Sequence, residues 1–304
     1  MISNRKSSFW YNLAGMSNVK KILILILSLA LIDFAIVRYL DSPSSVVLKE
    51  LINPSLKLEK VVVQELSGSK GAYAVAIKNL KTGESYYMDE KREFEAASLY
   101  KMWILAEAKN QIQKGRIKEG DILKEEIVDL NEIFNISSES AELTEGTVET
   151  TIKEAMRQMI VISHNYSALA LSKRIGISNA NKFIADNGFK QTSLAQPPKT
   201  TAYDALLFFE KLYKGELVSK EKSQEMMSLF KMQQLDNKLP KYLPEDVEIA
   251  HKTGELGFFS HDAGIVYGAK GDYIIVVLSN SSYPPAAVDR IGKISKAVYD
   301  YFED

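Results

Sequence analysis

The order of strand-like and helix-like patterns along the chain is the feature that most constrains its fold. Residues 71–90 are typical of a β-hairpin, because alternating apolar residues flank a turn-like stretch around Gly83. Residues 247–282 return to β-branched runs broken by glycines. Between them, from Leu99 to about Leu243, apolar residues mostly recur at steps of three and four, the period of a helix. The simplest arrangement is one sheet built from both ends of the chain, with a helical insertion between its halves.

Helical patterns outside and inside the strand regions complete the expected layers. Residues 56–66 and 285–302 have helical apolar spacing and would cover the sheet. The helical signals of the insertion each end near a glycine, and threonines are placed to cap the last of them; they cover 100–115, 151–176 and 200–215. We therefore expect an α/β (α+β) fold, with an antiparallel five-stranded sheet from both chain ends, covered by helices, and an inserted all-helical subdomain at about 102–243.

An apolar run near the N-terminus predicts a membrane segment. Residues 22–37 are almost entirely apolar, and basic residues precede them. Because positive charge stays on the cytoplasmic side, we expect a cytoplasmic segment at 1–21, a transmembrane anchor at 22–40 and a linker at 41–55. A cleaved signal peptide is the alternative, but the small residues just after the run lack the usual alanines. The domain at 56–304 would then lie outside the cytoplasm, held at the cell membrane by a single span.

The composition excludes several classes of site. There is no cysteine, so disulfides, thiolate metal ligands and cysteine nucleophiles are ruled out. The three histidines, His164, His251 and His261, have a spacing that matches no metal motif. Basic and acidic residues number 38 and 39 and are intermixed, which gives no support for a nucleic-acid partner. We expect no metal, no organic cofactor and a monomeric protein.

Ser98 and Lys101 form a Ser-x-x-Lys pattern where an acidic, strand-like segment gives way to an apolar helix. On a helix, positions i and i+3 share a face, so the amine is within reach of the hydroxyl. Such a lysine takes the serine proton only if burial or nearby positive charge lowers its pKa. A serine in the first helical turn also has free backbone N–H groups beside it, where an oxyanion would form. The pattern alone is weak, because it recurs at Ser3/Lys6, Ser17/Lys20, Ser67/Lys70, Ser219/Lys222 and Ser228/Lys231.

Two further motifs follow Ser98 and Lys101 in order. Ser-His-Asn stands at 163–165 between apolar helical segments, and Lys-Thr-Gly stands at 252–254 at the end of a strand-like run. Ser-x-x-Lys, Ser-x-Asn and Lys-Thr-Gly in this order are the signature of the penicillin-interacting serine enzymes. From about residue 56 to residue 302 the chain resembles class A β-lactamases and their penicillin-binding relatives. Other stretches similar to that family are FEAASLYK, TTAYDALLFFEKLYKGELVSKE and HKTGELGFFSHDAGIVY.

The resemblance implies catalytic roles for three residues. Ser98 would be the nucleophile that opens an amide or lactam carbonyl. Lys101 would be its base or proton relay, and Ser163 would pass a proton to the departing nitrogen. The implied activity is that of a serine acyl-enzyme hydrolase.

The resemblance also implies a set of substrate-binding residues. Asn165 would hold the side-chain amide of the substrate, and Lys252 and Thr253 would bind its carboxylate. The oxyanion would lie between the backbone N–H groups of the nucleophile and of Glu255, which follows Gly254. The expected ligand is a small-molecule β-lactam or a cell-wall peptide.

The resemblance to class A β-lactamases does not extend to the residue that releases the acyl group in those enzymes. Class A enzymes carry a glutamate between the second and third motifs, and it activates a water molecule. The corresponding interval here, 183–204, is short and contains no glutamate. Its two carboxylates, Asp186 and Asp204, look helix-terminal, and Gln196 cannot take a proton. The sequence therefore predicts acylation with weak deacylation.

Two smaller departures concern charge and motif form. His164 replaces the aspartate usual in class A, so the motif is the looser one of penicillin-binding proteins. Glu255 brings a negative charge beside a site meant for anions, and Lys252 is expected to offset it.

Three functions stay open. The first is a membrane-tethered serine hydrolase of β-lactams, or of D-alanyl peptides as a carboxypeptidase. The second is a non-hydrolytic sensor that is acylated or occupied by wall fragments. The third is a helical scaffold with relic motifs. Lys101 and Ser163 in working positions would favour the enzyme, because a binding protein has no need of them.

Overall fold

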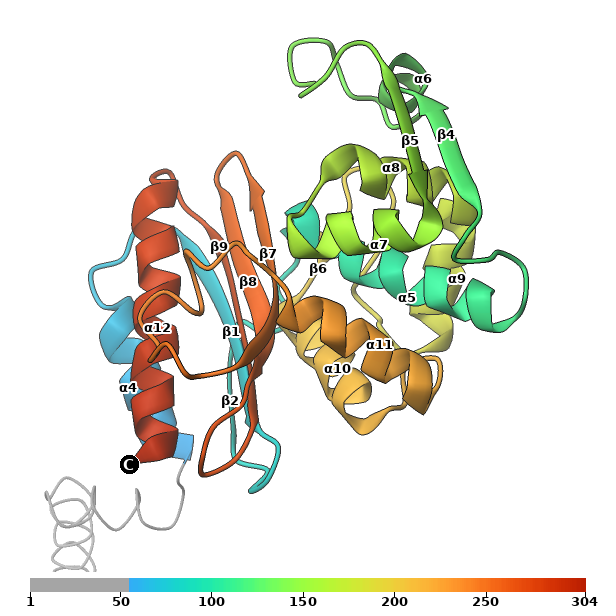
Figure 1. Ribbon diagram of the computed structural model, residues 1–304. Helices are drawn as coiled ribbons and strands as arrows, with labels where there is room; N and C mark the ends of the chain where they lie inside the picture. Colours follow the sequence, from blue (N-terminus) through green and yellow to red (C-terminus); the bar gives the residue numbers. More distant parts are fainter. Residues whose placement is uncertain (1–54) are drawn as a thin grey trace, which may run out of the picture. The chain divides into compact units, whose positions relative to one another are not determined.

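The structure, a computed structural model, describes residues 55–304 (Figure 1). Within it, Leu58–Asp304 form one compact unit. The predicted segment 1–21, anchor 22–40 and linker 41–55 lie outside the described residues, except for Ser55. In the described part of the chain, no helix is both long and apolar enough to cross a bilayer.

The five-stranded antiparallel sheet expected from the sequence is confirmed. Its strands lie in the order β2-β1-β9-β8-β7. The first and last strands of the chain pair with each other, from Ala72 opposite Asn280 to Asn79 opposite Tyr273. The two ends of the chain therefore build one sheet, and β7, which carries Lys-Thr-Gly, is an edge strand. The bounds are Ala72–Asn79 (β1), Ser85–Met88 (β2), Ile249–Leu256 (β7), Phe259–Val266 (β8) and Tyr273–Asn280 (β9).

The central strands bury side chains on both faces of the sheet. In β9, Ile275 and Val277 pack with the terminal helices, whereas Ile274 and Val276 pack with the insertion. A strand buried on both faces is an almost continuous apolar run, as the sequence of β9 shows. Figure 1 shows the two terminal helices together on one face of the sheet and the insertion on the other. The terminal helices are α4 (Ser55–Leu66) and α12 (Pro284–Glu303).

The insertion is mainly helical, as expected, but not entirely so. Two strand pairs interrupt it: β4 (Ile122–Glu126) with β5 (Thr147–Thr151), and β3 (Phe94–Glu95) with β6 (Lys199–Thr200). The strand character of β5 has a local cause, because Thr and Val predominate in it and favour extended backbone. The helices are α5 (Tyr100–Gln113), α6 (Ile127–Ile133), α7 (Ile152–Val161), α8 (Asn165–Ile175), α9 (Ile177–Asp186), α10 (Ala202–Lys214) and α11 (Lys220–Lys231).

Helix α5 is the buried centre of the insertion. Every residue from Lys101 to Lys109 is buried. Trp103 packs edge-on against Phe189 and Phe208, with ring centroids 6.0 and 5.6 Å apart. A helix that is covered all round has its direction set by its surroundings. The short turn directly before it, Ala97–Leu99, packs against β7 at the edge of the sheet.

Gly264 of β8 lies so close to β7 that no side chain fits. A Cβ at this position would lie 2.5 Å from the Ala250 carbonyl oxygen and 2.5 Å from the His251 Cβ. We expect Gly264→Ala to displace β7 and to lower the free energy of unfolding by about 1–3 kcal/mol, measured by urea denaturation of the full-length protein. Gly120→Ala is the matched control, because a Cβ at Gly120 meets nothing within 4 Å. Equal destabilisation by the two substitutions would contradict the tight approach of the strands.

Candidate active site

Ser98 lies in a short 3-10 turn, Ala97–Leu99, that joins strand β3 to helix α5. Ala97 has a φ of +43°, in the left-handed region that residues with a side chain seldom adopt. Gly254 of β7 packs against this turn, where a Cβ would lie 3.3 Å from the Ala96 carbonyl oxygen and from the Ala97 Cβ. The glycine of Lys-Thr-Gly thus lets the edge strand approach the serine. As predicted, Ser98 lies where a strand gives way to a helix, although the next N–H group, that of Leu99, donates to the Ala96 carbonyl at 3.0 Å and is not free.

Ser163 lies in the link between α7 and α8 and has a φ of +58°. The link is fixed from both sides. The N–H of His164 donates to the Gln158 carbonyl at 3.1 Å, and the Nδ1 of His164 accepts from the Ser167 N–H at 3.1 Å. The exposed ring of His164 therefore caps α8. The left-handed backbone directs the Ser163 hydroxyl toward α5, where Lys101 meets it.

Two lysine amines converge on the Ser163 hydroxyl. Lys101 Nζ lies 3.2 Å from Ser163 Oγ and also donates to the Ser163 carbonyl and to Asn165 Oδ1, both at 2.6 Å. Lys252 Nζ donates to the same hydroxyl at 2.9 Å and to the Thr253 carbonyl at 2.8 Å. A hydroxyl oxygen has two lone pairs. Since both accept from lysines, the proton of Ser163 is free to be donated elsewhere.

Burial lowers the pKa of both lysine amines. The side chains of Lys101 and Lys252 have no exposed surface. Loss of solvation lowers the pKa of Lys101 to about 7, against a smaller opposing effect of Glu142. The pKa of Lys252 is also lowered, first by burial and then by the charge of Lys101, although Asp262 opposes the change. At neutral pH Lys101 is therefore present in part as the neutral amine, the form that accepts a proton.

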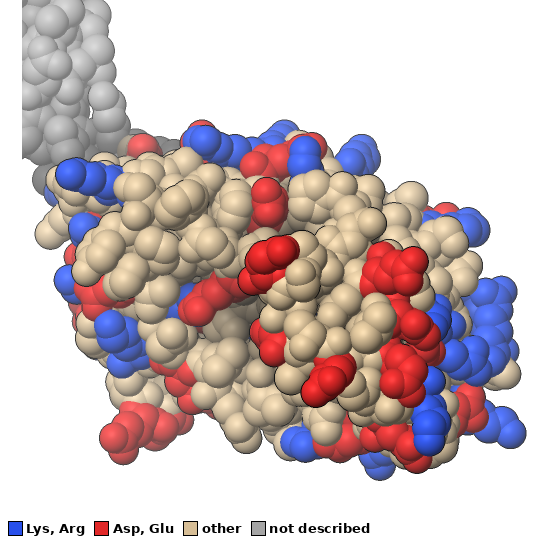
Figure 2. Space-filling view, turned by 90° about the horizontal axis from the view of Figure 1, so that it is seen from above, with Lys and Arg blue, Asp and Glu red and all other residues tan. Residues whose placement is uncertain are grey.

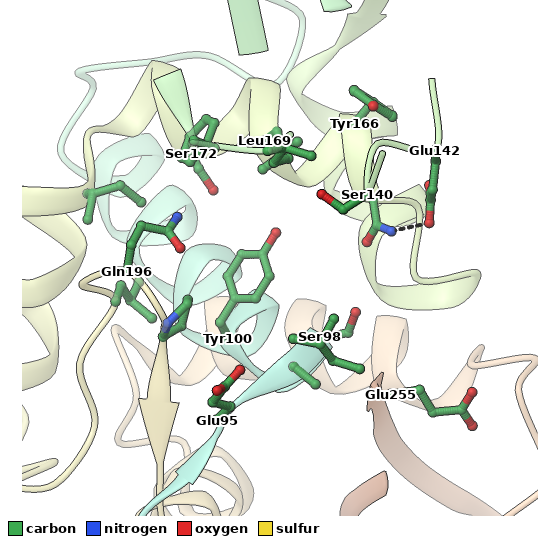
Figure 3. A pocket seen from close by; sticks show the side chains of 18 residues that line it. Glu95, Ser98, Tyr100, Ser140, Glu142, Tyr166, Leu169, Ser172, Gln196 and Glu255 are labelled. Carbon is green, nitrogen blue, oxygen red and sulfur yellow. Dashed lines mark hydrogen bonds between the residues drawn. The ribbon is translucent and has the colours of Figure 1, made fainter. Parts of the chain in front are cut away.

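The hydroxyl of Ser98 borders the same site without joining this network. It makes no hydrogen bond to any residue in 55–304, and the Lys101 amine is bonded to Ser163 and Asn165 instead. Catalytic hydrogen bonds are often long in unliganded enzymes and shorten when substrate binds. Of the four side chains predicted to meet, Lys101, Ser163 and Lys252 are joined directly, and Ser98 lies in the wall of the adjoining cavity (Figure 3).

The cavity beside Ser98 has a volume of about 360 Å³. One part of its wall is apolar and is formed by Phe134, Ile136, Leu169, Ile177 and Leu194. Three carboxylates also line it, from Glu95, Glu142 and Glu255. Figure 2, which looks down on the molecule of Figure 1, shows a hollow in this face with acidic side chains around it. Residues 55–304 contain no cluster of three or more side chains suited to hold a metal ion.

The side-chain amide of Asn165 is engaged at both ends. Its oxygen accepts from Lys101, and its nitrogen donates to Glu142 at 2.5 Å (dashed in Figure 3). Glu142 is exposed and comes from the loop between α6 and β5. For Asn165 to hold a substrate amide, as predicted, it must give up the bond to Glu142. No motif pointed to Glu142, because it meets the site only through the fold of this loop.

The carboxylate of Glu255 is neutralised by Lys238 and not, as expected, by Lys252. Lys238 is 1% exposed and forms an ion pair with Glu255, whereas the Lys252 amine is bonded to Ser163 and Thr253. In Figure 3 the Glu255 carboxylate points away from Ser98. The backbone groups of residues two apart on a strand point to the same side. The Glu255 N–H therefore points to the same side of β7 as the Thr253 carbonyl, which accepts from the Lys252 amine. Lys238 was missed because a lysine buried in a loop has no sequence pattern.

His261 holds strand β3 against the sheet. Its Nδ1 accepts from the Ser279 N–H at 3.2 Å, so Nε2 carries the proton and donates to the Glu95 carbonyl at 2.8 Å. Burial lowers the pKa of His261 to about 4. The neutral ring therefore fixes the last residue of β3, directly before the turn that holds the nucleophile.

Comparison with known proteins agrees with the geometry. A model of the beta-lactamase enzyme family matches residues 57–302, and no curated protein matches the sequence significantly. Among solved structures, PBP-A is 25% identical with a TM-score of 0.73, over 81% of this chain and 96% of that one. A PBP-A mutant, in an acyl-enzyme complex with penicillin G, is 24% identical with a TM-score of 0.73 and the same coverage, 81% and 96%. The TLA-3 extended-spectrum beta-lactamase is 21% identical with a TM-score of 0.72, over 82% of this chain and 100% of that one.

The neutral state of His261 makes stability depend on pH. An unfolded chain protonates this histidine near pH 6.5, whereas the folded ring resists until about pH 4. Between these values the unfolded state binds more protons, so lowering the pH removes about 3 kcal/mol of stability from this residue. Urea denaturation of the full-length protein near pH 6.5 and near pH 4 measures the free energy of unfolding. His261→Gln should lose less of this free energy than the parent between the two pH values.

His251→Gln is the comparison of opposite sign. Burial opposes protonation of His251, but Asp262 and Asp236 outweigh it and raise its pKa. The stability that His251 contributes is therefore present at low pH and declines as the pH rises above about 6.5. If both substitutions changed the pH dependence of the free energy of unfolding in the same direction, the opposite roles of the two histidines would be contradicted.

Proposed function

The chain belongs to the beta-lactamase enzyme family, and on that premise we propose a serine hydrolase that acts through an acyl-enzyme on β-lactams or related amides. The observation that carries the proposal is the convergence of Lys101 and Lys252 on the Ser163 hydroxyl, beside the cavity lined by Ser98. Burying two amines costs free energy. A protein that only binds has no use for an amine whose pKa lies near 7, whereas an acylating enzyme requires one.

In the proposed acylation, neutral Lys101 takes the proton of Ser98 while Ser98 Oγ attacks the carbonyl carbon. The oxyanion forms beside the backbone N–H groups of Ser98 and Glu255. Ser163, whose oxygen accepts from both lysines, donates its proton to the departing nitrogen and regains one from Lys101. The C–N bond breaks, and the acyl group remains on Ser98 as an ester.

Substrate recognition is proposed to rest on the end of β7 and the start of α8. Lys252 and Thr253 are buried beside Ser163 and would bind a substrate carboxylate. An arriving carboxylate favours the charged form of Lys252 and so counters the burial that lowers its pKa in the free protein. Asn165 would hold the substrate amide after releasing Glu142.

Release of the acyl group is proposed to be slow. The segment between α9 and α10 presents Leu194, Gln196 and Pro198 to the cavity, and an amide orients water but takes no proton from it. Asp186 ends α9, and Asp204 is buried in the first turn of α10, so neither lines the cavity. This segment, where the related enzymes carry their general base, therefore supplies none, and loss of such a base typically slows the step by roughly 10²–10⁴-fold.

A D-alanyl-peptide carboxypeptidase, or a sensor that stays acylated, is the alternative. The likeness to PBP-A, one mutant of which forms an acyl-enzyme with penicillin G, supports it. A cell-wall peptide would then replace the β-lactam as the natural ligand. The persistence of the acyl group separates these functions from an efficient β-lactamase.

We also propose a single-pass membrane location, with the hydrolase domain outside the cytoplasm and monomeric. The apolar run within 22–40 and the basic residues before it support this placement. There the domain would meet both β-lactams and cell-wall peptides.

Intact-mass measurement over time after adding penicillin G tests the proposal. Full-length protein, purified in detergent, should gain the mass of one penicillin within minutes and lose it slowly. Ser98→Ala should gain none. Ser228→Ala, which alters another Ser-x-x-Lys pattern on the exposed side of α11, should react as the parent does. An adduct on Ser98→Ala would rule out this nucleophile, and rapid turnover would rule out slow release.

The rate of acylation should rise with pH around a midpoint near 7, because only neutral Lys101 accepts the proton of Ser98. Lys101→Arg keeps its charge at every pH and should slow acylation by about 10²-fold or more. Stopped-flow mixing with a chromogenic cephalosporin measures the rate. Lys109→Arg is the control, since Lys109 is also buried in α5 but pairs with Glu119 and Glu225. A rate that does not change across neutral pH would contradict the role of Lys101.

A further inference from the structure

We propose that Glu95 is the general base for the slow release of the acyl group, an inference that rests on the acyl-enzyme proposed above. It is one of three carboxylates that line the cavity. Glu255 is paired with Lys238, and Glu142 accepts from Asn165. Within residues 55–304 the carboxylate of Glu95 has no hydrogen-bond or ion-pair partner. It is therefore the pocket carboxylate that is free to take a proton from water.

The backbone around Glu95 is fixed. Phe94 is buried, and because side chains alternate along a strand, Glu95 faces the opposite way, toward the cavity. His261 donates to the Glu95 carbonyl at 2.8 Å, and the N–H of Ala96 donates at 2.8 Å to a carbonyl of the segment before α10. These bonds fix the backbone that carries the Glu95 side chain, on the strand that leads directly into the turn of Ser98. A base on fixed backbone has less freedom to lose during the reaction than one on a mobile segment.

No neighbouring cation neutralises Glu95. Its cross-strand neighbour is Lys199, but the amine of Lys199 lies 3.6 Å from Glu93. Glu93 is two residues earlier and on the same side of the chain, yet it is exposed and does not line the cavity. The two glutamates therefore differ in access to the acyl group and provide a matched pair.

Gln196 lies on the same side of the pocket as Glu95. In Figure 3 the Glu95 carboxylate lies beside the Tyr100 ring, between the Gln196 side of the pocket and Ser98, whereas Glu255 lies on the far side of Ser98. The amide of Gln196 donates and accepts hydrogen bonds, so it can orient a water molecule, and a carboxylate supplies the proton acceptor that the amide lacks. The polar lining and the volume of about 360 Å³ leave room for ordered water.

The release step balances with water as its only other reactant. Water attacks the carbonyl carbon of the ester on Ser98, and Glu95 takes a proton from that water. The oxyanion forms where it formed during acylation. When it collapses, the C–O bond to Ser98 breaks and Glu95 returns the proton to the Ser98 oxygen. The products are a carboxylic acid and the free serine hydroxyl.

The lifetime of the acyl group tests this role separately from acylation. Full-length parent, Glu95→Gln, Glu95→Asp and Glu93→Gln proteins are acylated with penicillin G, freed of excess reagent and followed by intact mass. We expect Glu95→Gln to be acylated within about threefold of the parent rate but to lose its adduct at least about tenfold more slowly. Glu95→Asp should retain part of the release rate, and Glu93→Gln should retain all of it.

The outcomes distinguish the two proposals. An unchanged adduct lifetime in Glu95→Gln, or a parent adduct that never decays, overturns the role of Glu95 and leaves acylation by Ser98 standing. Equal slowing of acylation and release in Glu95→Gln indicates a merely structural residue and also overturns it. A parent that gains no adduct overturns the proposed function and this inference together.

Discussion

The site depends on the burial of two lysine amines against one serine hydroxyl. Removing the amines of Lys101 and Lys252 from water is unfavourable, and it is offset by the oxygens that accept from them, those of Ser163, Asn165 and Thr253. These groups come from a helix start, an interhelical link and an edge strand that are far apart in the chain. The burial of α5, the strained link before α8 and the close approach of β7 are each needed to bring them together. The same burial that costs stability makes one amine a proton acceptor at neutral pH.

The fold was predictable because its signals are local and periodic. Short windows of sequence are enough to recognise the strand-like runs at 71–90 and 247–282 and the helical spacing between them. Thr201 caps α10 by accepting from the Asp204 N–H at 3.1 Å, as the threonines before that helix indicated. The motif residues Lys101, Ser163 and Lys252 meet as the resemblance implied.

The remainder could not be predicted because it arises from packing between distant segments. Strands β4 and β5 are only five residues long each, too short for an alternating pattern to stand out within a helical region. Glu142 and Lys238 reach the site through loops, whose sequences carry no period. Glu95 precedes the nucleophile in an ordinary acidic stretch and lies outside the interval 183–204, where the related enzymes carry their general base. What separates Glu95 from Glu93 is which side chain reaches the cavity, and that follows only from the position of β3 beside the pocket.

The pairing of β1 with β9 has a consequence for how the protein is made. About two hundred residues separate these strands, so closing the sheet carries the entropic cost of a very long loop, which grows as the logarithm of its length. Nearly the whole chain must leave the ribosome before β1 finds its central neighbour. Until then β1, with its apolar side chains, is an exposed edge strand of the β1–β2 hairpin, and such an edge is prone to aggregate. Biogenesis of this protein is therefore governed by its last strand, and truncations near the C-terminus remove the middle of the sheet rather than its margin.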